Sequence, residues 1–414
     1  MTATMIRRDP MVVTWLVAVA VSGFGDVVWT VALAWTAAHA LSPTVAGLVL
    51  GIEMLPQAAL VLVGGVIADR WDPRRVLVAG EVTRAAVLVA GALAWKGGYD
   101  GAPTLFLVSL SFGIAAGLTI PSGMALVRQV VHPDDFGTVV GWNQVSGRVM
   151  RLLGAPAGGV LVAQSYAGSV AGGGPVLAML VDAATFAVVA VVLVAVVRTR
   201  YPAPRAEHAR WRDSFTDGLA YLRRSPTARV FVVGLTALNV FVTPVVALGL
   251  ALRVEGSGWG AHWFGICDGA LAAGAIVGSL AAIRWQPTRA AGSGFRVLVL
   301  QGVGLAAVGV PALPVVLAGM LTVGVTAGMA SVWLSGAFLK AINPEYTGRV
   351  SSVTSLGDMT LMPLSVPVLG AFSGATSVLT ATATFGLAMS VLCLVLATRP
   401  EIAGLVQRYA SPKV

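Results

Sequence analysis

Charged side chains are scarce in this chain of 414 residues. Asp, Glu, Lys and Arg make up 11% of the sequence, whereas hydrophobic residues make up 57%. Soluble globular proteins carry roughly 25% charged residues, so this chain has too few to cover a water-facing surface. Its apolar runs are continuous rather than alternating, which excludes an outer-membrane β-barrel. We therefore expect an all-α integral membrane protein.

Residues that bind metals or form disulfides are also scarce. Cys267 and Cys393 both lie in apolar runs, so neither a disulfide framework nor a metal site is expected. The four histidines are scattered among predicted loops and form no catalytic cluster: His39, His132, His208 and His262. The phosphate-binding pattern Gly-x-x-x-x-Gly-Lys-[Ser/Thr] does not occur, so ATP is not the direct energy source. We expect no cofactor, no metal and no enzymatic activity.

Twelve apolar runs can cross a bilayer core roughly 30 Å thick. They cover residues 12–38, 43–68, 76–96, 103–130, 138–163, 175–197, 230–253, 261–283, 295–310, 314–340, 349–371 and 375–397. The ninth run is short and is followed by Pro311 and Pro314. We interpret the first run as a span rather than a signal peptide, because it is longer than the apolar core of a signal peptide.

Basic residues fall almost entirely on one side of these spans. With the N-terminus in the cytoplasm, 23 of the 27 Lys and Arg lie in cytoplasmic segments, and Lys96 and Arg253 lie outside. Arg148 and Arg151 fall within the fifth run. The positive-inside rule therefore predicts that both termini are cytoplasmic. The preference for Arg over Lys, with abundant Ala, Val and Gly, indicates a GC-rich genome and hence the plasma (inner) membrane of a bacterium.

The longest polar stretch, residues 198–229, divides the chain into two halves. Within it Trp211, Phe215, Leu219 and Leu222 recur at helical spacing, which predicts a short amphipathic helix on the inner membrane face. The alternative is a solvated linker that only stays inside. The predicted parts are an N-terminal six-helix bundle at 1–197, the linker at 198–229, a C-terminal six-helix bundle at 230–398 and a cytoplasmic tail at 399–414.

The two halves repeat each other at two places. Arg-Trp-Asp-Pro-Arg-Arg at residues 70–75 returns as Arg-Trp-Gln-Pro-Thr-Arg at 284–289, an offset of 214. Pro-Asp-Asp-Phe-Gly at 133–137 returns as Pro-Glu-Tyr-Thr-Gly at 344–348, an offset of 211. Two matches at nearly one offset, in equivalent loops, indicate a six-plus-six duplication. This is the parallel repeat of a transporter whose site lies between its halves.

The end of the second predicted span carries a recognisable motif. Gly-Val-Ile-Ala-Asp-Arg at residues 65–70, followed by Arg74 and Arg75, resembles the signature loop of the major facilitator superfamily, a family of transporters. The resemblance implies the major facilitator fold and a gating loop made of Gly65, Asp69, Arg70, Arg74 and Arg75. A carboxylate at Asp69 can bond a neighbouring helix N-terminus or an arginine and so latch the cytoplasmic side. The alternative is that the arginines only enforce topology.

Further motifs in the first half resemble the drug-efflux branch of this family, which contains macrolide and enterobactin exporters. They are Gly25-Asp26, Leu55-Pro56, the linker segment at 217–226 and a fifth-span motif made of Gly154, Pro156, Gly158 and Gly159. Asp72-Pro73 stands where the family more commonly has a Gly or an Arg, and Pro156 falls one place later than in Gly-Pro-x-x-Gly-Gly. The fifth-span motif predicts close helix packing and a bend, or a role in the direction of transport.

Ionisable residues inside the membrane are expensive and are functional by default. Asp26 lies near the middle of the first span and Glu53 lies in the second. An apolar environment disfavours the charged form of a carboxyl group, which can then exchange a proton. Arg148 and Arg151, three residues apart on one face of the fifth span, are the predicted partners. The alternative is a permanent ion pair that fixes helix packing. Three further acids lie within spans: Asp182, for which we favour a packing role, Asp268 and Asp358.

Aromatic and amide side chains within spans are candidates for a substrate cavity, although Trp in membrane proteins is often an interfacial anchor. The candidates are Trp29, Trp35, Gln57, Trp142, Asn143, Asn239 and Trp333. We expect a secondary transporter that exports a small, largely apolar molecule by proton-coupled alternating access. The alternatives are an uncoupled facilitator or lipid flippase of the same fold, or a membrane-embedded lipid-modifying enzyme. The expected partners are a small-molecule substrate, protons and membrane lipids, with no nucleic acid and a monomeric state.

The distribution of bases makes a testable prediction about topology. Single cysteines introduced at Gly172 and Glu207 should react with a membrane-impermeant thiol reagent from opposite sides, and Gly172 should react from outside. The background should be low because Cys267 and Cys393 lie in apolar runs. Labelling of intact cells and of inverted vesicles measures this, and reaction of both sites from one side would contradict the six-plus-six interpretation.

Overall fold

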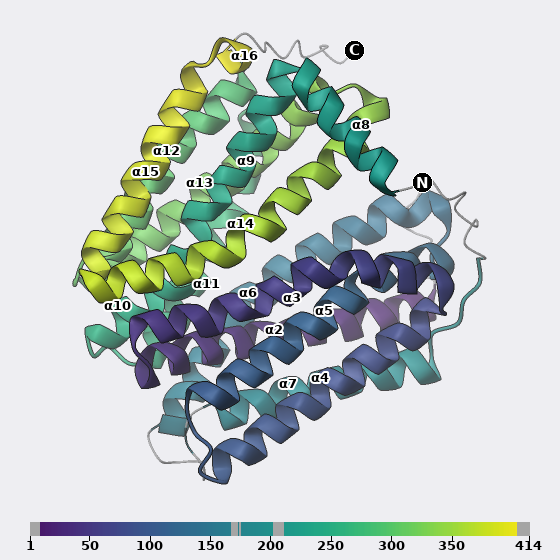
Figure 1. Cartoon of the computed structure of the whole chain (residues 1–414), viewed down its shortest axis with the longest axis vertical. Helices are drawn as coiled ribbons and strands as arrows, with labels where there is room; N and C mark the ends of the chain where they lie inside the picture. The colour runs from purple at the N-terminus through teal and green to yellow at the C-terminus, as the bar shows by residue number, and fades with distance from the viewer. Residues whose placement is uncertain (1–8, 167–172, 174, 202–210, 404–414) are drawn as a thin grey trace. The chain divides into compact units, whose positions relative to one another are not determined.

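The computed structural model describes residues 9–166, 173, 175–201 and 211–403, and all regular elements within these residues are helices (Figure 1). The predicted all-α class is therefore confirmed. Gly172, Glu207 and most of the cytoplasmic tail lie outside the described residues. Because a helix satisfies its own backbone N–H and C=O groups, it is one of the few structures that can cross a bilayer.

Six long helices precede the linker: α2 (Pro10–Ala40), α3 (Pro43–Arg70), α4 (Pro73–Lys96), α5 (Ala102–Val130), α6 (Phe136–Tyr166) and α7 (Val176–Ala195). The sequence itself contains the signals that start the first three of these helices. Asp9, Ser42 and Asp72 are N-cap residues whose side chains accept backbone N–H groups, and each is followed directly by a proline. Proline is favoured in the first turn, where its missing N–H has no helical partner in any case.

The second half repeats this order after α8 (Trp211–Arg224). Its elements are α9 (Pro226–Pro244), the π-helix η2 (Val245–Gly249), α10 (Leu250–Gly256), α11 (Ala261–Arg284), α12 (Ala290–Val308), α13 (Leu313–Ala341), α14 (Thr347–Ala375), α15 (Val378–Thr398) and α16 (Pro400–Ala403). The segments α9, η2 and α10 form one continuous span that widens after Pro244. A proline lacks the N–H that would bond to the preceding turn, so a local π-helix at this point has a clear cause.

Twelve long helical segments therefore lie where the sequence predicts spans. Eleven of them, counted over the described residues, are both long and apolar enough to cross a membrane. The remaining one, α6, has 31 residues but carries Asn143, Arg148 and Arg151 in its first half. The ninth span also differs from its prediction, because α12 begins five residues earlier, at Ala290.

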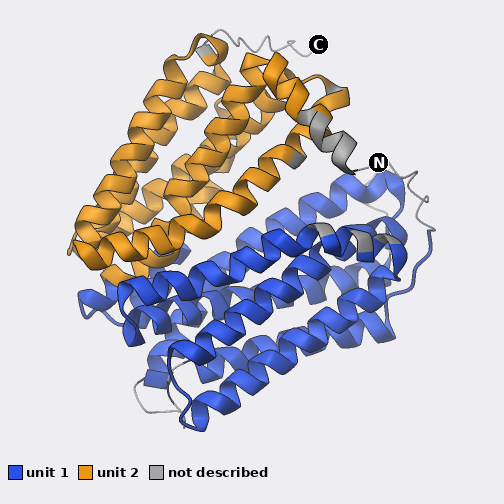
Figure 2. Cartoon of the chain, in the orientation of Figure 1, with its two compact units in different colours: residues 1–205, 254–269 blue, residues 206–253, 270–414 orange. Residues whose placement is uncertain are grey.

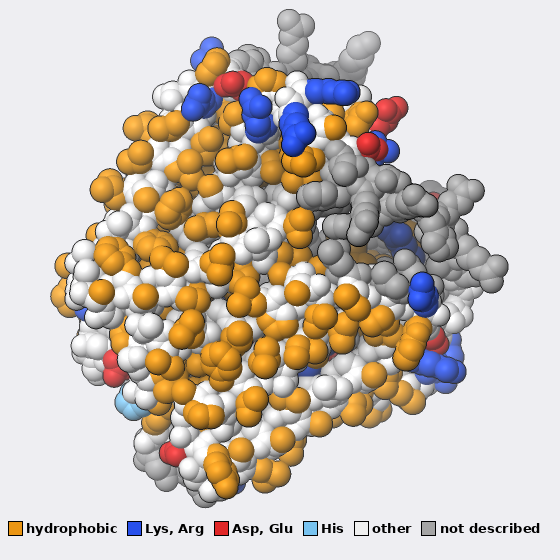
Figure 3. Space-filling view, in the orientation of Figure 1, with side chains coloured by type: hydrophobic (Ala, Val, Ile, Leu, Met, Phe, Trp, Pro, Cys, Tyr) orange, Lys and Arg blue, Asp and Glu red, His pale blue; other side chains and the backbone are white. Residues whose placement is uncertain are grey.

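The chain divides into two compact units (Figure 2). Unit 1 comprises residues 1–205 with 254–269, and unit 2 comprises 206–253 with 270–414. Unit 1 thus contains α2 to α7 and also the first turns of α11. Within each unit hydrophobic side chains dominate the visible flanks, and most of the visible Lys and Arg gather at one end (Figure 3). This is the surface expected of helices that face lipid along their length and water at their ends.

Glycines bring neighbouring helices together in unit 1. A Cβ added to Gly64 of α3 would collide with the carbonyl oxygen of Gly117 on α5, and a Cβ added to Gly113 of α5 would collide with the carbonyl oxygen of Glu53 on α3. Each helix thus packs against the backbone of the other. Such small-residue interfaces drive helix association where lipid removes the hydrophobic driving force between helices.

The same packing recurs in unit 2 at the offsets of the sequence repeat. Gly278 of α11 lies 214 residues after Gly64, and Gly324 of α13 lies 211 residues after Gly113. Gly278 faces the backbone of Val325, and Gly324 faces the backbone of Leu271. The repeated loop forms a 3₁₀ turn in both halves, as η1 (Pro133–Asp135) and η3 (Pro344–Tyr346). The duplication inferred from two short loops therefore extends to the helix interfaces.

The linker contains the predicted short helix, as α8. Its Leu222 is buried in a cluster with Val232, Ile342 and Val350 of unit 2. Tyr221 of α8 stacks on Tyr346 with ring centroids 4.5 Å apart. The apolar side of α8 therefore packs in part against protein, whereas the prediction had placed it against the membrane.

Adjacent glycines on α3 supply a matched test of the helix packing. Gly64→Ala should destabilise the protein by about 1–3 kcal/mol, because its Cβ would force α3 away from the α5 backbone. Gly65→Ala should not lower stability, since a Cβ there meets nothing within 4 Å and Ala is the better helix former. Thermal unfolding of the two purified variants in detergent measures the difference. Equal melting temperatures for both variants would show that this glycine contact does not hold α3 to α5.

Candidate functional site

A buried ion pair lies in the middle of α4. Arg84 is eleven residues beyond Pro73, at the start of the helix, and thus roughly 16 Å along its axis. One terminal nitrogen of its guanidinium group lies 2.7 Å from Oε1 of Glu81, one turn earlier. The side chains of Arg84 and Glu81 are only 15% and 9% exposed. A base at this depth in a membrane helix needs an acidic partner, and Glu81 supplies it.

Three carboxyl groups on other helices interact with the same arginine. Arg84 interacts electrostatically with Asp26 of α2, Glu53 of α3 and Asp182 of α7. Asp26 also interacts with Glu53, Glu81 and Asp182, so the four acids form one electrostatic cluster. Four helices of unit 1 therefore contribute acidic groups to a single guanidinium. We call these five residues the Arg84 cluster.

The Arg84 cluster borders a cavity of about 390 Å³ within unit 1. Its polar wall includes Asp26, Glu53 and Arg84. The remaining lining residues are mostly apolar or neutral: Trp29, Thr30, Gln57, Leu77, Phe112, Ala116, Thr119, Ile120 and Gly123. A mostly apolar cavity with a few convergent polar groups is typical of a small-molecule site.

Gly25 allows α2 to approach the innermost acid of the cluster. Asp182 is fully buried, and its Oδ1 accepts a hydrogen bond from Thr185 at 3.1 Å. A Cβ on Gly25 would collide with the side chains of both Asp182 and Thr185. Only a glycine thus fits where α2 crosses α7, immediately before Asp26. The helix is continuous here, so Gly25 serves close packing rather than a break in α2.

Aromatic rings cover the arginine on the side of α5 and α7. The guanidinium carbon of Arg84 lies 4.6 Å from the ring centroid of Phe186. Phe186 contacts Phe112 at 5.8 Å between centroids, and Phe112 contacts Trp29 at 6.1 Å. A cation held over an aromatic face in a desolvated site is stabilised by the ring quadrupole. The rings therefore continue from the buried charge to the cavity wall.

The hydrogen-bonding capacity of the cluster is incompletely used. Three buried polar atoms of the cluster have no hydrogen-bond partner among the described residues, namely Glu81 Oε2, Arg84 Nε and Asp182 Oδ2, and the same holds for Nε1 of Trp29 in the cavity wall. Unpaired buried polar groups are destabilising, and they concentrate at sites that bind something or change state. The arrangement can hold protons on its carboxyl groups and can accept polar groups of a small molecule.

The positive charge that acts on Asp26 is that of Arg84, which was not among the predicted partners. Arg151 of α6 instead pairs with Asp268 at the start of α11, 2.8 Å away. Arg148 lies three residues before it on α6. The sequence interpretation missed Glu81 and Arg84, and it was wrong to count Arg84 among the cytoplasmic bases, because the side chain is buried in α4. The available signal was an acid and a base three residues apart inside the predicted third span.

The fifth-span motif packs on two sides of α6. Gly154 and Gly158 face α2 at Val27 and Val28, and Gly159 faces Gly265 of α11. Pro156 contacts Gly269, also of α11. Every contact of this motif therefore brings α6 close to a neighbouring helix within unit 1, and α6 remains one continuous helix through Pro156.

The gating-loop residues lie at the junction of α3 and α4. Arg70 ends α3, and Arg74 donates hydrogen bonds to the carbonyl oxygens of Leu193 and Val194 on α7, both at 2.6 Å. Asp72 is the N-cap of α4, which explains the Asp-Pro pair at this departure from the family pattern. A Cβ on Gly65 would meet open space, and the side chain of Asp69 lies outside what the structure describes.

Only some of the residues predicted to line a substrate cavity lie at the Arg84 cavity. Trp29 and Gln57 line the cavity. Trp142 and Asn143 are exposed on α6, and Trp35 is buried next to His39. In unit 2, Asn239 donates to Asp358 at 3.2 Å, and the buried Trp333 donates to the carbonyl oxygens of Ala282 and Trp285 at the end of α11.

The family model described as Major Facilitator Superfamily matches residues 15–359. Similar folds occur in the nucleoside transporter NupG, with a TM-score of 0.69, 13% identity and coverage of 94% of this chain and 98% of that one. They also occur in a bacterial homologue of the human lysosomal transporter Spinster (inward-facing and unoccupied), with a TM-score of 0.69, 14% identity and coverage of 97% and 100%. A D-xylose–proton symporter gives a TM-score of 0.65 at 13% identity and coverage of 95% and 100%.

A local sequence match adds one curated relative. The 3-(3-hydroxy-phenyl)propionate transporter of Escherichia coli (strain K12) is 30% identical over 112 residues. The match covers 27% of this chain and spans about a quarter (24%) of the relative's length.

Removal of the central cation should destabilise unit 1. Arg84→Gln leaves Glu81 without its ion-pair partner and should lower the free energy of unfolding by about 3–5 kcal/mol. The loss should shrink in acidic buffer, where protonated carboxyl groups no longer repel one another. Arg70→Gln, which removes an exposed base at the end of α3, is the control and should change stability by less than about 0.5 kcal/mol. Unfolding in detergent at several pH values measures both variants, and an Arg84→Gln variant as stable as the control would contradict the central role of Arg84.

Proposed function

Because the chain belongs to the Major Facilitator Superfamily, we propose that it exports a small, largely apolar molecule across the plasma membrane by proton-coupled alternating access. Membership of this family makes the protein a multi-pass membrane transporter for a small molecule, and not an enzyme. The proposal of proton-coupled export rests on the Arg84 cluster, in which one guanidinium is paired with Glu81 and interacts electrostatically with three further carboxyl groups, beside a cavity.

Charge balance makes this cluster a proton site. With every group ionised, the four carboxylates and one guanidinium would carry a net charge of −3, and an unpaired charge in a membrane interior is strongly destabilising. The cluster approaches neutrality when protons bind to its carboxyl groups. A change in access to water therefore changes the number of bound protons, which couples the proton gradient to conformation.

The cavity indicates how a substrate competes with those protons. Asp26 and Glu53 belong to the Arg84 cluster and also line the cavity, next to Trp29 and Phe112. A molecule with an apolar body suits the aromatic wall, and its polar groups suit the two acids. Protons that bind to Asp26 and Glu53 remove hydrogen-bond acceptors and negative charge from the site, and so favour release of the substrate. Proton entry and substrate exit are then linked, as in an antiporter.

The gating loop connects the Arg84 cluster to the conformational change that alternating access requires. Arg74 ties the start of α4 to the last carbonyl groups of α7, so α4, which carries Glu81 and Arg84, is held at its end. We propose that Asp69 latches the same side of the membrane, with both termini in the cytoplasm. The motifs shared with macrolide and enterobactin exporters support a place in the drug-efflux branch.

A second function has its own supporting observation. Glu81 and Arg84 are neighbours on one helix and are already 2.7 Å apart, so this pair can persist through every conformation. If the remaining acids were also permanently paired or neutral, the protein would be an uncoupled facilitator or a lipid flippase. The two functions differ in whether a proton gradient drives accumulation against a concentration difference.

The proposal makes a prediction for Asp26. Asp26→Asn should abolish gradient-driven accumulation in inverted vesicles, because the amide keeps the side-chain volume but cannot exchange a proton. The substrate should still bind through Glu53 and the aromatic wall, but more weakly than to the wild type, because the neutral amide mimics protonated Asp26. Asp26→Glu should keep part of the activity with a displaced pH optimum. A panel of lipophilic fluorescent dyes identifies a transported compound, and dye uptake with and without a proton gradient is then compared among variants.

The control for this experiment is Asp358→Asn, which removes an acid from unit 2 that pairs with Asn239 outside the Arg84 cluster. It should retain proton-driven uptake. A stable Asp26→Asn variant that still accumulates dye with unchanged pH dependence would remove Asp26 from the coupling mechanism and make Glu53 the next candidate. Wild-type dye movement that does not respond to the gradient would favour the uncoupled facilitator.

A further inference from the structure

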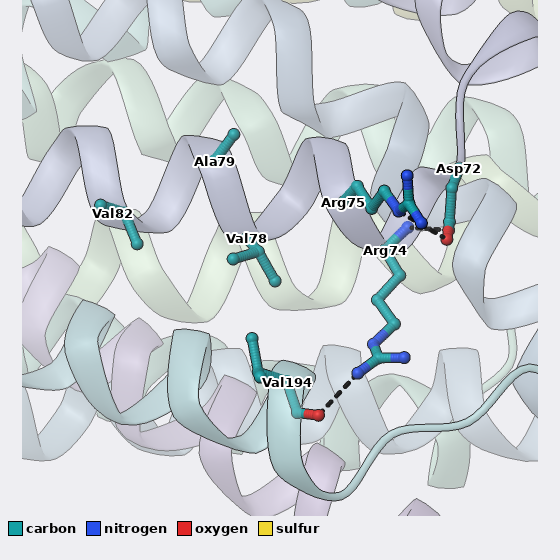
Figure 4. Close-up of a pocket in the computed structure, with 7 residues that line it drawn as sticks. All are labelled: Asp72, Arg74, Arg75, Val78, Ala79, Val82 and Val194. Carbon is teal, nitrogen blue, oxygen red and sulfur yellow. Dashed lines mark hydrogen bonds and ion pairs between the residues drawn. The ribbon is translucent and has the colours of Figure 1, made fainter.

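A groove of about 520 Å³ lies between the start of α4 and the end of α7 within unit 1 (Figure 4), and it shares no lining residue with the Arg84 cavity. Asp72, Arg74 and Arg75 border its polar end. Val78 and Val82 of α4 point toward Val194 of α7 along its apolar part. The proposed transport function uses none of the apolar residues of this groove.

Arg74 closes the inner wall of the groove. Its Nε donates to the carbonyl oxygen of Leu193 and its terminal nitrogen donates to that of Val194, both at 2.6 Å. The last carbonyl groups of a helix have no partner within the helix, and the C-terminal end carries a partial negative charge. Arg198 also donates to the carbonyl oxygens of Val194 and Val197, at 3.1 and 3.0 Å. Two guanidinium groups thus neutralise the end of α7, so it does not repel an anion.

Arg75 presents its guanidinium group at the mouth of the groove. Its side chain is 87% exposed, and Asp72 lies 3.8 Å from its Nε, beyond hydrogen-bond distance. The carboxylate of Asp72 itself accepts the backbone N–H of Arg74 at 2.9 Å as the cap of α4. Several of the five N–H donors of Arg75 thus face the surface. The groove mouth as a whole, with Arg74, Arg75 and Asp72, carries a net positive charge.

Two exposed apolar tracks lead away from this charged end. On α4 the residues that follow Arg75 at helical spacing are exposed: Ala79, Val82, Ala86, Val89 and Leu93. On α7 they are Val188, Val191 and Val194, which precede the exposed Arg198. Val82 and Val194, which face each other across the groove, are 53% and 54% exposed. Each track ends in an arginine at the same end of the helix pair.

The order of charged and apolar residues along the groove matches that of the headgroup and acyl chains in a lipid leaflet. Val78 and Val82 lie five and nine residues beyond Pro73, which places them roughly 8 and 14 Å along α4, whereas Arg75 lies roughly 3 Å along it. A phosphate at Arg75 would therefore leave an acyl chain beside the valines. A soluble anion would use only the charged mouth, and an apolar peptide would not use Arg75.

We propose that this groove binds one anionic phospholipid, with its phosphate at Arg75 and one acyl chain between Val82 and Val194. The lipid would come from the leaflet on the side of Arg74, Arg75 and Arg198, which the distribution of bases predicts to be the cytoplasmic one. Basic side chains at a membrane surface attract anionic lipids, and here the bases stand at the top of an apolar groove. The proposal is independent of the substrate and of proton coupling.

Native mass spectrometry of the full-length protein in detergent tests the site. Titration with dioleoyl phosphatidylglycerol should show one lipid that binds more tightly than any that follow, and dioleoyl phosphatidylcholine should show no such first event. Arg75→Gln should weaken the first binding event about five-fold, the change expected for one base at a lipid surface. Val82→Trp fills the apolar part and should weaken it as well.

Two matched variants serve as controls. Arg289→Gln removes the base at the position equivalent to Arg75 in the repeated loop, and Val277→Trp enlarges a valine on α11 that is 57% exposed. Both should bind phosphatidylglycerol as the wild type does. Equal losses in Arg75→Gln and Arg289→Gln would overturn the proposal in favour of general charge attraction. Displacement of the first lipid by glycerol phosphate alone would overturn it in favour of a soluble anion, and an unchanged affinity in Val82→Trp would also overturn the acyl-chain placement.

Discussion

Burial of ionised groups in a low-dielectric interior is the constraint on which the site depends. An acid or base at the centre of a membrane helix costs about 2.5–3.5 kcal/mol on insertion scales, so five such groups together would not persist without mutual compensation. Glu81 compensates Arg84 directly at 2.7 Å, and Phe186 covers the guanidinium face. The other acids, on α2, α3 and α7, interact electrostatically with the same charge. Arg84 therefore links four helices of unit 1 electrostatically.

Small residues make this arrangement possible. Gly25 lets α2 reach the side chain of Asp182, and Gly113 lets α5 reach the backbone next to Glu53. The acids lie within electrostatic range of one arginine because the helix axes approach closely at these points, and any side chain there would separate the helices. The electrostatic interactions of the cluster thus depend on close helix packing at these glycines. The repetition of the α3–α5 glycines at the equivalent positions of α11 and α13 shows that the second half keeps the packing, although Ile283 replaces the acid of the gating loop.

The arginines at the helix ends act on different neighbours from Arg84. Arg74 and Arg198 satisfy the carbonyl groups that end α7, so they stabilise a helix terminus that would otherwise face the interface unpaired. Bases that a hydropathy plot assigns to topology therefore also have structural contacts. The exposed Arg75 differs from both, because it combines a surface charge with an apolar groove directly below it. Helix capping and lipid contact are thus divided between two adjacent arginines, Arg74 and Arg75.

The sequence by itself determined the class, the order of the helices and the internal repeat, because apolar length, Pro and N-cap signals, and motif offsets are local properties. Asp26 and Glu53 were recognisable as unusual because a carboxyl group in an apolar run has a known cost. Tertiary structure alone decided the partners. Helical spacing shows which residues share a face but not which neighbouring helix that face meets. Arg151 therefore pairs with Asp268, 117 residues away, and Asp26 interacts electrostatically with Arg84. Trp29 and Gln57 reached the cavity whereas Trp333 caps α11, since the rotation of each helix about its axis depends on packing between distant segments.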